Sequence, residues 1–89
     1  MNFGEVIEKI RDGQKRAARP GWHGKGMFIY VELGKTIPFS VLREPQKSWL
    51  KGDMKVLPHF NLFTDGVIVT GWLASQTDML ALDWVLLDS

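Results

Sequence analysis

Aromatic rings, cations and side-chain amides are the groups in this sequence that could bind a small molecule. Flat rings stack on an aromatic base, amides hydrogen-bond to sugar hydroxyls, and cations pair with phosphate. The rings are Trp22, Phe28, Tyr30 and Trp72, the cations are Arg16, Arg19 and Lys25, and the neutral polar side chains are Asn61, Gln76 and Thr77. This set predicts a binding site for a ligand that combines a base, sugars and phosphate.

The sequence offers little for catalysis. His23 and His59 lie on different segments, and neither has a carboxylate at a spacing that would support a metal site or a triad. Ser75 lacks the context of a nucleophile elbow, whereas Ser75 and Asp78 have the spacing of a helix-capping box. The chain has no cysteine, which excludes thiolate zinc sites and fits a reducing compartment. We therefore expect no enzyme activity, no metal and no cofactor.

Length and charge narrow the class of protein. The 89 residues predict one domain over residues 1–89. With 11 Lys and Arg against 10 Asp and Glu, the net charge of +1 is too balanced for a general nucleic-acid binder or a protein of anionic membranes. No segment approaches the roughly 18 apolar residues of a membrane span, and the N-terminus lacks a basic region followed by an apolar run. We expect a soluble, unexported protein that contacts neither nucleic acid nor membrane.

The aromatic content predicts a homo-oligomer. Four Trp, five Phe and one Tyr present more large aromatic surface than the core of so short a chain easily encloses. Without disulfides, association of subunits is a common way for a small domain to gain stability. Some of the rings should therefore lie at a subunit interface or in a pocket.

The N-terminal half predicts a helix and two strands. Asn2 and Glu5 form a capping box before an apolar stripe, and Gly13 ends this helix of roughly three turns. Residues 14–19 fit a short edge strand, whose cations either protect the edge or contact an anion. Residues 22–26 form a loop that either folds its tryptophan onto the core or brings the backbone close to a phosphate.

The next strand, residues 27–33, has two different faces. One is aliphatic and is expected to pack on the first helix, while the other carries Phe28 and Tyr30 and needs a cover. Residues 34–53 predict a short strand near residues 37–42 and then a long excursion. Trp49 on this excursion is either a lid over an apolar face or part of a subunit contact.

The C-terminal half predicts antiparallel strands. Residues 55–64 alternate as one strand, Asp65-Gly66 is a strong hairpin signal, and residues 67–70 return as the next strand. A short helix over residues 76–80 and a last strand over residues 83–87 follow. The expected fold class is therefore α+β, a small antiparallel sheet with an N-terminal helix and a short helix before the last strand. Trp84 is expected in the core or at an interface.

Five motifs give the chain a family resemblance. They are NFGE at residues 2–5, PGWHGKGMF at 20–28, PHF at 58–60, DG at 65–66 and GWLASQTDMLALDW at 71–84. Together they resemble the second type of Thoeris anti-defence protein, a phage and prophage family. The resemblance implies a sponge, a protein that sequesters without cleavage the cyclised ADP-ribose signal made by the TIR-domain enzyme of Thoeris immunity. It also implies a homotetramer with ligand sites between subunits, acting in the cytoplasm of the infected bacterial host.

Laying the binding chemistry on these motifs predicts a role for each site residue. Trp22 with Phe28 or Trp72 would sandwich the adenine. Lys25 and Arg19 would address the pyrophosphate. The ribose hydroxyls would meet Asn61, Asp78 and the turn at Gln76 and Thr77. Two other functions stay open, an enzyme that degrades a cyclic nucleotide signal and an inhibitor that binds a protein of the defence system. The segment over residues 34–53 resembles the family least, and preferences for other cyclic isomers could differ there.

Overall fold

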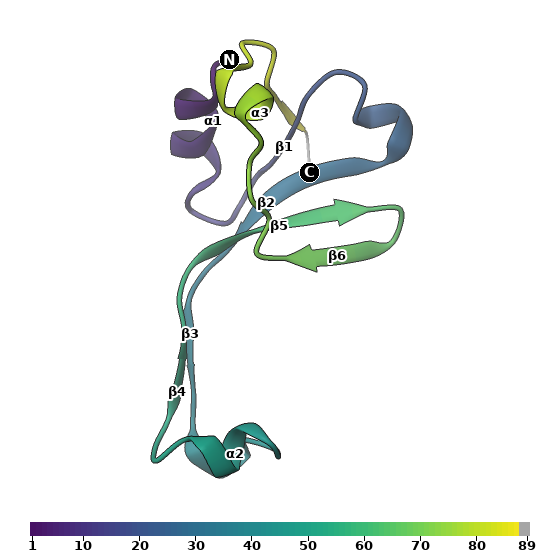
Figure 1. Ribbon diagram of the computed structural model, residues 1–89. Helices are drawn as coiled ribbons and strands as arrows, with labels where there is room; N and C mark the ends of the chain where they lie inside the picture. Colours follow the sequence, from purple (N-terminus) through teal and green to yellow (C-terminus); the bar gives the residue numbers. More distant parts are fainter. Residues whose placement is uncertain (88–89) are drawn as a thin grey trace.

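The computed structural model describes residues 1–87, apart from the side chain of His23, and is built on a five-stranded antiparallel sheet (Figure 1). The strand order is β6-β5-β2-β1-β7. The strands are β1 (Arg16–Ala18), β2 (Met27–Glu32), β5 (His59–Thr64), β6 (Val67–Thr70) and β7 (Val85–Leu87). Helices α1 (Phe3–Ile10) and α3 (Gln76–Leu80) lie next to each other at one end of the molecule, and a 3-10 turn η1 (His23–Lys25) precedes β2. The expected α+β class is confirmed.

Helix α1 begins where the capping box predicts. The Asn2 side chain accepts a hydrogen bond from the backbone of Glu5, whose carboxylate accepts one from the backbone of Asn2. The helix has 8 residues, slightly over two turns and shorter than expected. Val6 and Ile10 are fully buried and pack with Ile29, which confirms that the aliphatic face of β2 meets this helix.

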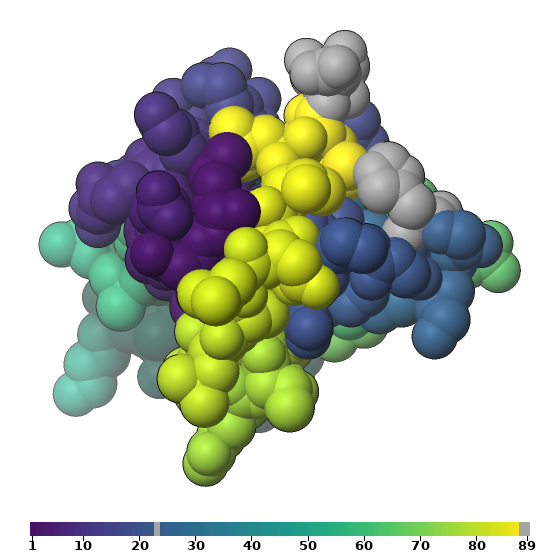
Figure 2. Space-filling model, turned by 90° about the horizontal axis from the view of Figure 1, so that it is seen from above, coloured from purple at the N-terminus to yellow at the C-terminus, as the bar shows by residue number. Residues whose placement is uncertain are grey.

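Trp84 closes the core and joins the two ends of the described chain. Its side chain is 1% exposed, and its indole Nε1 donates a hydrogen bond of 2.8 Å to the backbone carbonyl of Asp78. The backbone N–H of Trp84 donates to the carbonyl of Met1, and the terminal amine of Met1 donates to the carbonyl of Trp84 at 2.8 Å. Figure 2 shows the N-terminal and C-terminal segments side by side, in purple and yellow. The expectation of a core or interface position for Trp84 is confirmed as core.

Strand β1 is not the edge strand that its cations suggested. It pairs with β2 on one side and with β7 on the other, so it lies inside the sheet. Ala17 and Ala18 are fully buried, because their small side chains fit where the sheet is closely packed. Strand β7 begins at Val85, two residues later than expected, because Asp83 and Trp84 belong to the connection from α3.

The expected strand over residues 55–64 is two strands in two sheets. Strand β4 (Met54–Val56) pairs with β3 (Lys35–Ile37), whereas β5 pairs with β2 and β6. Pro58 lies between β4 and β5. Because proline has no backbone N–H, it cannot donate a hydrogen bond to a neighbouring strand. The Asp65-Gly66 hairpin is confirmed, with φ of 48° and 82° at the two turn residues, as a type I′ turn requires.

The segment over residues 34–57, called the arm below, extends away from the body of the protein (Figure 1). It consists of β3, a 3-10 turn η2 (Phe39–Val41), a short helix α2 (Gln46–Trp49) at the tip, and β4. The strand expected near residues 37–42 therefore lies earlier, in β3. The radius of gyration is 15.7 Å, whereas a compact chain of this length would have about 12 Å. Trp49 is 72% exposed, so among the described residues it is not a lid over an apolar face.

The base of the arm requires a glycine. A Cβ atom on Gly34 would lie 2.6 Å from the carbonyl oxygen of Val56 and 2.9 Å from the ring of Pro58. Such contacts are too short for any side chain, so the two strands of the arm leave the body in close contact.

No helix among residues 1–87 is long and apolar enough to cross a membrane.

Arg19 ties β1 to the C-terminal segment. Its guanidinium forms ion pairs with Asp78 of α3 and with Asp83, each at 3.1 Å. These hydrogen bonds, to Asp83 and then Asp78, raise the pKa of Arg19. Burial alone would raise the pKa of the Asp78 carboxyl, but the hydrogen bonds from Ser75 and Arg19 outweigh burial and hold that pKa below its ordinary value. The Ser75–Asp78 capping box of α3 is confirmed.

The lowered pKa of Asp78 predicts a pH-dependent stability. The carboxylate stabilises the fold above about pH 4, the pKa of an unfolded Asp, and the contribution is lost as the pH falls through the lowered value. We expect Asp78→Asn to lower the free energy of unfolding by about 1 kcal/mol at pH 7. The difference from wild type should shrink at pH 3. Urea unfolding followed by tryptophan fluorescence measures both.

Asp65→Asn is the matched control, because Asp65 is exposed in a turn whose left-handed backbone asparagine also adopts. It should change the free energy of unfolding by less than about 0.5 kcal/mol at either pH. An effect of Asp78→Asn that is equally large at pH 7 and pH 3 would contradict the role assigned to this carboxylate.

Candidate functional site

The predicted site residues lie on opposite faces of the five-stranded sheet. Trp22 and Trp72 pack against the hydrophobic core on the α1 side. Phe28 lies on the opposite face, because it alternates along β2 with the buried Ile29. One chain therefore does not bring Trp22 and Phe28 around one adenine ring, and that expected sandwich is not formed within a protomer.

The tryptophans of the α1 side form a cluster with Trp84. Trp22 meets Trp72 edge-to-face at 6.2 Å between ring centroids, and meets Trp84 at 5.2 Å. Phe3 lies 6.3 Å from Trp72 and 5.3 Å from Trp84. The contacts of Trp22 with Trp72 and Trp84 are edge-to-face, which stabilises the core and leaves no parallel slot between Trp22 and Trp72. The reading of residues 22–26 as a loop that folds its tryptophan onto the core is confirmed.

Asn61 is held by contacts within the chain. It is 4% exposed, and its amide nitrogen donates a hydrogen bond to the hydroxyl of Tyr30 at 3.2 Å. Its side-chain oxygen accepts one from the backbone N–H of Gly71 at 3.3 Å. Its predicted contact with a ribose hydroxyl stays a prediction.

Of the remaining predicted residues, Arg19 and the first turn of α3 lie together, while Lys25 lies in η1. Lys25, Gln76 and Thr77 are exposed, the lysine in η1 and the other two in the first turn of α3. Arg19 and Asp78 are paired with each other, so a pyrophosphate at Arg19 would compete with two carboxylates. Their roles in binding stay predictions.

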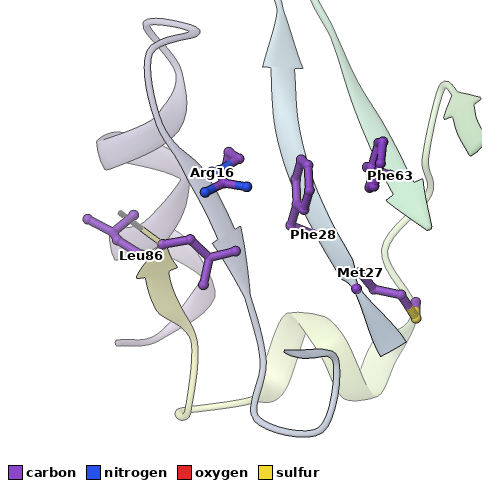
Figure 3. Close-up of a pocket in the computed structure, with 7 residues that line it drawn as sticks. Arg16, Met27, Phe28, Phe63 and Leu86 are labelled. Atoms are coloured by element: carbon purple, nitrogen blue, oxygen red, sulfur yellow. The ribbon is translucent and has the colours of Figure 1, made fainter. Parts of the chain in front are cut away.

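The face opposite the helices carries a group of aromatic side chains around one arginine, called the aromatic face below. Phe28 and Phe63 stack with their ring centroids 4.7 Å apart and their planes 13° from parallel. Tyr30 lies 6.2 Å from Phe28. The guanidinium carbon of Arg16 lies 4.7 Å from the centre of the Phe28 ring, a cation-π distance. Figure 3 shows Arg16, Phe28 and Phe63 side by side on β1, β2 and β5.

The strand register explains this grouping. Phe28 is paired with Phe63, and Tyr30 is paired with Asn61 on one side and with Arg16 on the other. Residues paired across antiparallel strands point to the same face, so the aromatic face follows directly from the pairing. All three rings and Arg16 are half-buried, which leaves part of each accessible.

The aromatic face is hollowed next to Arg16. The hollow has a volume of about 560 Å³, within the range of roughly 300–1,000 Å³ that is usual for small-molecule sites. Its lining residues are Arg16, Gly26, Met27, Phe28, Phe63, Leu86 and Leu87. A smaller hollow of about 320 Å³ adjoins it and shares Arg16, Phe28 and Phe63. A stacked pair of rings beside a guanidinium suits an aromatic group that carries a negative charge.

Sequence reasoning predicts only Phe28 among the residues that line this hollow, and it misses Phe63 and Arg16 next to it. Phe63 was seen only as one position of an alternating strand, and Arg16 was considered as a cation but not assigned to the site. Neither could be placed without the register of β5 on β2 and of β1 on β2, which joins residues far apart in the chain. The one signal in the sequence was that Phe28 and Tyr30 share a strand face that needs a cover.

A metal site does not compete with this assignment among the described residues, because they contain no group of three or more His, Cys, Asp or Glu side chains that could hold an ion.

Comparison with known proteins identifies the family. The chain matches the Thoeris anti-defense 2-like domain over residues 1–87. It is 30% identical over 88 residues to Thoeris anti-defense 2 of Bacillus phage SP01, a match that covers 94% of this chain and 91% of that protein. The resemblance carried by the five sequence motifs is thereby confirmed. The chain belongs to the Thoeris anti-defense 2-like family.

Proposed function

We propose that this protein counters Thoeris defence by binding and sequestering a cyclic ADP-ribose-type signal, such as glycocyclic ADP-ribose, without cleaving it. Membership of the Thoeris anti-defense 2-like family supports the action against Thoeris. The chemistry of the aromatic face supports the class of ligand. The protein would act in the cytoplasm of the infected host, where the signal is made.

The observation that carries this proposal is the position of Arg16 beside the stacked pair Phe28 and Phe63. An adenine ring would stack on Phe63, because Phe28 itself lies between Phe63 and Arg16. A pyrophosphate gains by charge-assisted hydrogen bonds to the guanidinium of Arg16. A cyclic ADP-ribose holds base and pyrophosphate in one compact molecule. The aromatic face offers both partners, one on each side of Phe28.

A sponge needs affinity and has no need of a poised acid, base or nucleophile. Tight binding of a small ligand requires that most of its surface be buried. The hollow on the aromatic face is open toward solvent, so we propose that assembly of the subunits encloses it. A homotetramer with ligand sites between subunits is the assembly that we propose.

The fate of the signal tests the proposal. The protein is incubated with glycocyclic ADP-ribose, the free ligand is removed by filtration, and the retained fraction is heat-denatured and analysed by chromatography. We expect the signal to be retained by the protein and released intact after denaturation. The same cyclic compound, unchanged in mass and retention time, should be recovered in stoichiometric amount.

Two other outcomes have different meanings. A cleaved product after incubation would show an enzyme that degrades the signal and would sink the sponge proposal. Free signal that stays in the filtrate at every protein concentration would leave an inhibitor that binds a defence protein. Heat-denatured protein is the control for adsorption to the filter.

Substitutions on the aromatic face test the site. Phe63→Ala removes the ring proposed to stack on the base, and Arg16→Gln removes the cation on the other side of Phe28. We expect each to raise the dissociation constant of the signal about tenfold to a hundredfold, since each contact of this kind contributes roughly 1–3 kcal/mol. Isothermal titration calorimetry with purified variants measures the change.

Lys35→Gln is the matched control for Arg16→Gln, because it removes one positive charge from an exposed position on the arm. It should leave the dissociation constant within about twofold of wild type. Equal weakening by Lys35→Gln and Arg16→Gln would mean that overall charge, not the aromatic face, holds the ligand. Trp72→Ala is a poor test of the site, because Trp72 packs in the core cluster and its loss would disturb the fold.

A further inference from the structure

Strand β6 is an edge strand without protection. It pairs with β5 on one side and has no strand on the other within residues 1–87 (Figure 1). All four of its residues are exposed, and Val67, Ile68 and Val69 are 58%, 53% and 45% exposed. Proteins usually protect such edges with charges, proline or a bulge, because the unpaired backbone can accept a further strand. β6 has neither charge nor proline.

The geometry of the hairpin shows which backbone groups of β6 are available. In a two-residue hairpin, the residues that flank the turn, here Thr64 and Val67, are bonded to each other, and bonded pairs then alternate with non-bonded ones. Val69 is the next residue bonded to β5, and Gly71 continues the alternation with a 3.0 Å bond from its N–H to the carbonyl of Phe60. The N–H and C=O groups of Ile68 and Thr70 therefore point away from the sheet.

We propose that β6 pairs antiparallel with β6 of a second copy of this chain, across a two-fold axis at Val69. In this register Ile68 of one copy exchanges both N–H···O bonds with Thr70 of the other, and the two Val69 residues form a non-bonded pair at the axis. The strand suits a copy of itself because it has no charge to repel its partner and offers the same outward groups to both sides of the axis. Isologous pairing of this kind closes after two copies and leaves no further edge at β6.

The pairing joins the two five-stranded sheets into one and places both aromatic faces on the same side of it. Ile68 is paired with Phe63, so it extends each aromatic face toward the partner copy. Pairing of β6 with β6 of a second copy does not depend on which ligand the aromatic face binds. It assigns one of the contacts of the proposed oligomer to a particular strand.

Single cysteines test the register, since the natural chain has no cysteine. Val69→Cys would bring two sulfurs together at the axis, because non-bonded pairs have Cα atoms about 4.5 Å apart and a disulfide spans about 4.4–6.8 Å. Val67→Cys is the matched control on the same face of the same strand. Its two copies would lie four residues apart along the strands, roughly 13 Å.

We expect Val69→Cys to run as a disulfide-linked dimer on non-reducing gels after mild oxidation, and Val67→Cys to stay largely monomeric. Absence of a cross-link in oxidised Val69→Cys would overturn the proposal. Equal cross-linking of both variants would overturn it too, because it would show collision of exposed strands without a fixed register. Both substitutions are at exposed positions, so the fold should persist.

Ile68→Pro provides a second measurement. It removes the outward N–H of Ile68 and leaves the bonds between β6 and β5, whereas Ile68→Val keeps that N–H. We expect Ile68→Pro to halve the mass measured by light scattering and Ile68→Val to keep the wild-type mass. An unchanged mass for Ile68→Pro would contradict the pairing. Retention of the signal is assayed separately, so failure of the pairing and failure of the sponge proposal remain distinguishable.

Discussion

The indole of Trp84 is the contact on which the body of the protein depends. It packs against Phe3 of α1 and against Trp22 and Trp72, while its Nε1 bonds to the carbonyl of Asp78. One buried side chain therefore connects the first helix, the loop before β2, the connection after β6 and helix α3. An 89-residue chain has a small core, and a ring of this size supplies a large part of the buried apolar surface.

This use of the tryptophans is the reason why the ligand site is proposed on the opposite face of the sheet. Three of the four lie in the core or at its margin, whereas the opposite face carries half-buried rings of phenylalanine and tyrosine. The two faces of the sheet therefore differ in what covers them. The α1 side provides stability, and the aromatic face provides accessible rings next to a cation.

Local signals in the sequence predicted the elements well. The capping boxes at Asn2 and Ser75, the alternation in β2 and the Asp65-Gly66 turn depend on residues close together in the chain, and each was found at its expected place. The order of strands could not be predicted in this way. Cations in β1 suggested an edge, but β7 pairs there, some 70 residues further along the chain. Alternation across Pro58 joined two strands that belong to different sheets.

The sequence predicts the kinds of side chain at the candidate site, but it predicts only some of the particular residues. A set of rings and cations is apparent from composition, and the alternation in β2 places Phe28 and Tyr30 on one face, as the structure shows. That this face needs a cover stays a prediction. Phe63 and Arg16 join Phe28 only through strand register, which depends on long-range pairing. Trp22 and Arg19 contribute to packing and to an ion cluster, and their roles in binding stay predictions.

The position of Trp49 has a practical consequence for spectroscopy. It is the exposed tryptophan at the tip of the arm, whereas Trp22, Trp72 and Trp84 form one partly or fully buried cluster. The intrinsic emission therefore contains two populations, one open to an aqueous quencher and the other shielded from it. Iodide would extinguish the signal of the arm first, so motion or docking of the arm can be followed in the unlabelled protein separately from unfolding of its core.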